Sequence, residues 1–134
     1  MQLYDFMDNE KLEELVTAVE YVEYFTSVKQ EVLIKLDAVN WSIINCKHGY
    51  EEMKAKILLE TDFGELYGKN NDDVRASHIA LETKEIRESL EGYKHKRSVY
   101  QNQIDTLNDI ISINKLILKE SQCNCGDEHN GNPI

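Results

Sequence analysis

Proline and glycine are scarce in this sequence, with 1 proline and 6 glycines among 134 residues. Both residue types punctuate turns, so a compact α/β domain of this length would be expected to contain more of them. No stretch approaches the roughly 18 consecutive apolar residues that a membrane span needs, and no basic region followed by an apolar one opens the chain. The sequence therefore predicts a helix-rich cytoplasmic protein without a membrane segment.

Basic residues are also in deficit, because 15 Lys and Arg stand against 25 Asp and Glu, for a formal net charge of −10. Nonspecific binding to nucleic acid requires an excess of Lys and Arg. The one basic run, residues 94–97, is interleaved with glutamates that offset its charge. Nucleic acid is therefore not the expected partner. Most of the charge is expected on solvated helix surfaces. A second interpretation is an acidic face that competes with nucleic acid for a basic partner.

Apolar residues recur at helical spacing through the first half of the chain. From Leu12 to Ile57, steps of three or four residues fall on apolar or aromatic side chains, which predicts a helix over about 9–60. Asp8 or Asn9 is its expected N-cap. The weakest helix formers within it are Asn40 and Gly49. A break near either would give a three-helix bundle, which is the alternative to one long helix.

A loop and a second helix are predicted for the rest of the chain. Residues 61–71 contain two glycines and two asparagines, which indicates a loop. A heptad pattern then predicts a helix over about 72–120, with Thr83, Arg97 and Asn114 as the polar positions of its apolar seam.

Two helices of similar length joined by a short loop favour antiparallel packing. The sequence thus predicts an all-α fold, a long antiparallel coiled-coil helical hairpin over residues 1–120, with a flexible tail over residues 121–134. The apolar stripe widens over residues 110–118, where one partner helix would not cover it. We therefore expect assembly into a four-helix dimer, or docking on another protein. The residues expected to mediate interaction and assembly are Tyr93, Arg97, Tyr100, Ile104, Leu107, Ile111 and Leu118.

No catalytic motif is visible, and no enzyme activity is expected. Residues 64–69 resemble a phosphate-binding loop, but the spacer is one residue short and Asn70 follows in place of Ser or Thr. His78 and His95 lie off the heptad seam and are expected at the solvated surface. Cys46 falls on the apolar stripe and is expected to be a small core residue.

One group of residues at the end of the chain has metal-ligand chemistry. Cys123, Cys125 and His129 could supply two thiolates and an imidazole to zinc. A closed structural site needs a fourth ligand, from Asp127 or from another subunit. The alternative is a tail with incidental thiols, and no cofactor.

Three segments resemble parts of the small coiled-coil accessory proteins that tailed phages and prophages encode. They are residues 50–60, the Gly-Lys element within residues 68–75, and the heptad helix over residues 93–118. The resemblance implies a role in phage replication or recombination, or in countering host defence by binding a host protein. The expected function is therefore a non-enzymatic protein-interaction module in the host cytoplasm. A nucleic-acid-binding recombination accessory is the alternative.

Overall fold

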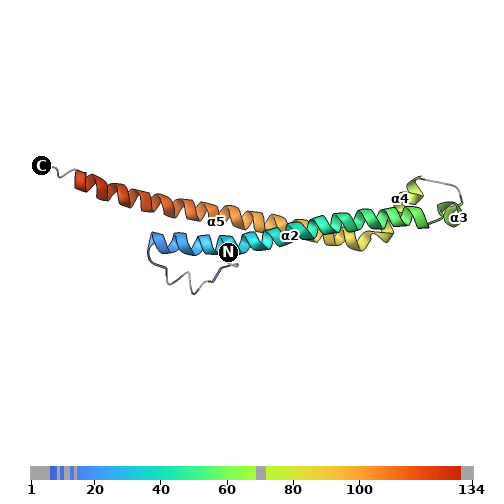
Figure 1. The fold of residues 1–134 in the computed structure, drawn as a ribbon, viewed down its shortest axis with the longest axis horizontal. Coiled ribbons are helices and arrows are strands. Elements are labelled where there is room, and N and C mark those ends of the chain that lie inside the picture. The colour runs from blue at the N-terminus through green and yellow to red at the C-terminus, as the bar shows by residue number, and fades with distance from the viewer. Residues whose placement is uncertain (1–6, 9, 11–12, 14, 69–71, 131–134) are drawn as a thin grey trace. The chain divides into compact units, whose positions relative to one another are not determined.

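The computed structural model describes residues 7–8, 10, 13, 15–68 and 72–130, with side chains as far as residue 121. The described residues form helices and no strand, in the order α2 (Ala18–Glu60), α3 (Phe63–Tyr67), α4 (Asp72–Glu82) and α5 (Lys84–Asn130) (Figure 1). The long helices α2 and α5 pack against each other as a helical hairpin. The predicted all-α hairpin fold is confirmed.

The chain divides into two compact units, where the sequence predicted one hairpin domain. Unit 1 combines Met1–Lys35 with Tyr100–Ile134, and unit 2 comprises Leu36–Val99. Each long helix contributes one segment to each unit. α5 continues to Asn130, beyond the end near residue 120 that the heptad pattern predicted.

α2 begins at Ala18, later than the start near residue 9 that the apolar stripe predicted. Thr17 stands at its first turn. The Thr17 hydroxyl accepts a hydrogen bond from the Glu20 backbone N–H at 3.1 Å and donates one to the Glu20 carboxylate at 3.1 Å. The Thr-x-x-Glu spacing is that of a capping box. This local signal, and not the start of the apolar stripe, fixes where the helix begins.

The segment before α2 packs back onto unit 1. Asp8 is not helical, and its backbone N–H donates to the Tyr24 hydroxyl at 2.9 Å. That hydroxyl in turn donates to the Asp8 carbonyl at 3.3 Å. Met7 is buried in the core. Asp8 lies well before Ala18, where α2 begins, so it is not the N-cap of that helix, and Asn9, the other candidate, lies outside the described residues.

α2 runs without interruption through Asn40 and Gly49 to Glu60. The alternative of a break near either residue, and with it the three-helix bundle, is wrong. Gly49 has a packing role, because a Cβ placed there would lie 2.9 Å from Cδ1 of Ile86. The missing side chain lets α2 and α5 approach closely in unit 2.

Unit 1 has an apolar core between the start of α2 and the second half of α5. Its buried members are Met7, Phe25, Val28, Val32, Leu107 and Ile111, and Tyr21, Val22, Tyr24, Tyr100, Ile104 and Ile110 pack around them. Four of the residues expected to mediate assembly, Tyr100, Ile104, Leu107 and Ile111, thus pack within the chain. The heptad seam is filled by the partner helix of the same hairpin.

The cap at Thr17 can be tested by Thr17→Ala. The substitution removes both side-chain hydrogen bonds at the first turn, so the free energy of unfolding should fall by about 1 kcal/mol. Ser27→Ala is the control, because Ser27 is exposed within α2 and alanine favours a helix there. Urea denaturation measures both. An equal effect of the two substitutions would contradict the cap.

Gly49 in α2 and Gly92 in α5 should respond differently to alanine. Nothing lies within 4 Å of a Cβ placed at Gly92, so Gly92→Ala should raise the free energy of unfolding by about 0.5–1 kcal/mol. Gly49→Ala should gain less, or lose stability, since the Ile86 methyl group must move. Thermal melts compare the stability of the two variants. An equal increase in stability would contradict the close approach of Gly49 to Ile86.

Candidate functional site

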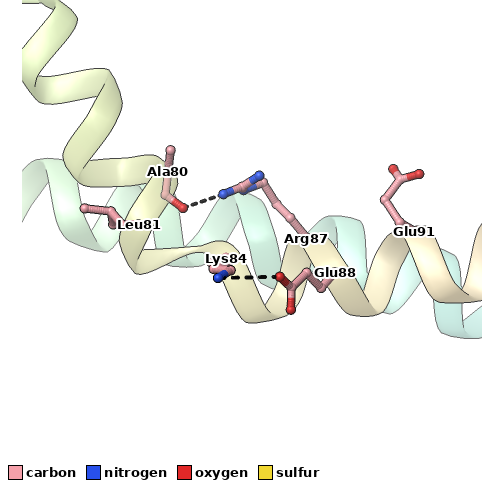
Figure 2. Close-up of a pocket in the computed structure, with 6 residues that line it drawn as sticks. All are labelled: Ala80, Leu81, Lys84, Arg87, Glu88 and Glu91. Carbon is pink, nitrogen blue, oxygen red and sulfur yellow. Dashed lines mark hydrogen bonds and ion pairs between the residues drawn. The ribbon is translucent and has the colours of Figure 1, made fainter.

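The second helix of the hairpin is interrupted at Thr83, between α4 and α5. Thr83 is fully buried, and its hydroxyl donates to the Ile79 carbonyl at 2.7 Å. A threonine bonded to the carbonyl four residues earlier tends to bend a helix. Arg87 braces the bend, because its Nε donates to the Thr83 hydroxyl at 3.3 Å and its guanidinium also donates to the Ala80 carbonyl (Figure 2). In an uninterrupted helix that carbonyl accepts from the amide of residue 84.

A surface hollow of about 420 Å³ lies beside this bend (Figure 2). It is lined by Ala80, Leu81, Lys84, Arg87, Glu88 and Glu91. Lys84 and Glu88 form an ion pair at 3.9 Å that is mostly exposed. Two basic and two acidic residues balance each other, so the hollow has no excess charge with which to select an ion.

The turn between α2 and α4 is built around the short helix α3. The Asp62 carboxylate accepts a hydrogen bond from the Glu65 N–H at 2.9 Å and caps α3. Gly68 ends it at a φ of 84°, and its N–H donates to the Gly64 carbonyl at 2.9 Å. Only glycine adopts that φ without strain. The segment predicted as a loop thus contains an ordered turn of helix.

An aromatic cluster joins α3 to α4. Phe63 is buried, and the His78 ring meets Phe63 and Tyr67 edge to face at centroid distances of 5.2 and 5.8 Å. The Tyr67 hydroxyl lies 2.7 Å from His78 Nδ1, within hydrogen-bonding distance. The Arg75 guanidinium lies 5.2 Å from the Phe63 ring centre. His78 is therefore a packed, hydrogen-bonded residue, not the solvated surface histidine that was predicted.

Around this cluster lies an exposed apolar surface, which we call the turn surface. Its exposed members are Leu66, Tyr67 and Leu81. Two hollows adjoin it. The first is lined by Ile57, Glu60, Thr61, Asp62, Glu65, Leu66, His78 and Glu82, and the second by Tyr67, Asp73, Val74, Ser77, His78 and Leu81. His78 borders both hollows, and Tyr67 borders the second.

A second exposed apolar patch, which we call the α5 outer face, lies in unit 1. Ile113, Leu116 and Ile117 are 58%, 59% and 47% exposed. At 3.6 residues per turn, Leu116 lies on the opposite side of α5 from the fully buried Leu107. These residues belong to the widened stripe over residues 110–118. In the described part of the chain no side chain buries them.

The predicted zinc ligands stand near the end of α5, and Cys46 stands on α2. Cys123, Cys125 and His129 lie on α5, but their side chains are outside the described part, so zinc stays a prediction. Among the side chains that are described, no group of three metal-ligating residues occurs. Cys46 is a half-buried free thiol.

The other three predicted assembly residues belong neither to the core cluster of unit 1 nor to the side chains packed around it. Tyr93, Arg97 and Leu118 are half-buried. In the basic run, Lys94 pairs with Glu91 at 3.4 Å and Lys96 lies 5.8 Å from the Tyr93 ring centre.

None of the helices described is both long and apolar enough to cross a membrane. A scan against protein-family models finds no match, and neither does a search of the curated proteins or of the solved structures.

The brace at the bend can be tested by Arg87→Met, which keeps the aliphatic stem and removes both hydrogen bonds. The free energy of unfolding should fall by about 1 kcal/mol, because the Ala80 carbonyl and the Thr83 hydroxyl lose a partner. Lys84→Met, one turn earlier, removes only an exposed ion pair and should change stability by less than about 0.5 kcal/mol. Urea denaturation that returns similar losses for both would show that Arg87 does not brace the bend.

Proposed function

We propose that this chain is a non-enzymatic protein-interaction module that assembles as a four-helix dimer. The observation that carries the proposal is the α5 outer face. Ile113, Leu116 and Ile117 present three aliphatic side chains to solvent on one side of a helix. Their spacing, at i, i+3 and i+4, is the pattern with which a helix packs against another helix.

Burial of this patch supplies the driving force for assembly. Each Å² of apolar surface removed from water contributes about 25 cal/mol. A second hairpin is the simplest source of a covering helix, and two hairpins give four helices. Leu116, at the centre of the patch, lies on the opposite side of α5 from the buried Leu107, so a partner can cover it without opening the core of unit 1.

The resemblance to accessory proteins of tailed phages and prophages supports a role beyond self-assembly. In this proposal the dimer binds a host or phage protein in the host cytoplasm and acts by that contact, as an anti-defence protein or as an accessory of replication or recombination. The net charge of −10 supports a protein partner over nucleic acid.

The dimer is tested by light scattering at micromolar concentration. The wild-type chain should have twice the monomer mass of 15.6 kDa. Leu116→Asp should shift the mass to that of the monomer, because a carboxylate at the centre of the interface loses its hydration without gaining a partner. A wild-type monomer would contradict the proposal.

Ile34→Asp is the matched control. Ile34 is 71% exposed on α2, so the change of side chain and charge is the same, but the residue is not part of the α5 outer face. This variant should keep the dimer mass. Circular dichroism on both variants shows that each is folded. Dissociation by both substitutions would mean that added charge, and not the α5 outer face, controls assembly.

A further inference from the structure

We infer that the turn surface of unit 2 binds a basic, amphipathic segment of another protein. The inference deepens the proposed function by giving the chemistry of the partner, and it rests on that function. The surface has two parts, an apolar one for aliphatic or aromatic side chains and an acidic one for Lys or Arg.

The apolar part is exposed and shaped. Leu66 and Leu81 are 61% and 75% exposed, and one hollow lies between Tyr67, Val74 and Leu81. Large exposed aliphatic side chains grouped around a hollow mark an interaction site more than the same side chains scattered singly.

The acidic part adjoins it. Ile57 and Leu66 form apolar walls of the other hollow, and its acidic lining residues are Glu60, Asp62, Glu65 and Glu82. The ion pairs Lys84–Glu88 and Lys94–Glu91 involve none of these four carboxylates. Four carboxylates on the lining of one hollow give it a negative potential, which attracts a cationic side chain. A Lys or Arg side chain combines an aliphatic stem with a charged end, which matches apolar walls and carboxylates in one hollow.

The framework of the surface is held in place before any partner arrives. Phe63 is buried, Asp62 caps α3, and the Tyr67 hydroxyl lies 2.7 Å from His78 Nδ1. A surface that needs little ordering on binding loses less affinity to conformational entropy.

The sign of the charge selects among the occupants. Nucleic acid would bring phosphates toward the four carboxylates, and a second copy of this chain would bring the same acidic surface. Both contacts are repulsive. A segment with Lys or Arg on one face and apolar residues on the other complements both parts of the turn surface at once.

The probe is a synthetic helical peptide with leucines on one face and lysines on the other, labelled for fluorescence anisotropy. Glu60→Gln combined with Glu82→Gln should weaken its binding about tenfold. Both glutamates end a helix, where a negative charge opposes the helix dipole, so their neutralisation should not unfold the chain. The matched control, Glu23→Gln combined with Glu31→Gln, has the same net charge and alters exposed residues of unit 1. It should weaken binding less than about twofold.

Leu66→Asn tests the apolar part and should also weaken peptide binding several-fold. Equal losses in the two glutamate variants, or no effect of Leu66→Asn, would show binding to general negative charge and overturn the inference. Tighter binding to a single-stranded DNA oligomer than to the peptide would overturn it too. Leu116→Asp should bind the peptide with the affinity of the wild type. Light scattering therefore tests the dimer, and peptide binding tests the turn surface, independently of each other.

Discussion

In a helical hairpin each helix has one neighbour, so each can bury only the stripe that faces it. This constraint governs the whole molecule. In unit 1 the facing stripes meet in one core, with Phe25 and Val32 on α2 and Leu107 on α5. A helix that is apolar on a second side is suited to a further neighbour. The second apolar side of α5, at Ile113 and Leu116, therefore has no cover within the described chain, and this surplus is what makes the protein a candidate for assembly.

The periodicity of the sequence was enough to predict the hairpin, the end of α2 at Glu60 and the start of α4 at Asp72. It could not predict where α2 begins, because apolar spacing continues upstream of Thr17 while a local cap decides the boundary. It also could not predict the bend at Thr83. A threonine in a helical pattern is compatible with a straight helix, and only its complete burial, with Arg87 on its hydroxyl, identifies the bend.

The same limit applies to the sites. A heptad pattern shows that residues such as Ile104 and Leu107 meet another helix, but not whether that helix belongs to the same chain. Here it does: the predicted assembly residues Leu107 and Ile111 are buried in the core of unit 1, and Tyr100 and Ile104 pack against that core. His78 shows the opposite case. Its partners Phe63 and Tyr67 come from a segment whose sequence indicated only a loop, so nothing in its own surroundings along the chain predicted its contacts.

A helical hairpin exposes apolar side chains in many places, and exposure alone does not identify an interface. Ile34 and Val16 are each highly exposed and carry no proposal. Two further properties separate the proposed surfaces from these. The α5 outer face repeats at helical spacing on one side of one helix, which suits a second helix. The turn surface combines exposed leucines with a hollow whose charges are all of one sign. A hollow lined by carboxylates attracts a cation and repels an anion. The charge at the turn therefore restricts the partner more sharply than the apolar area does.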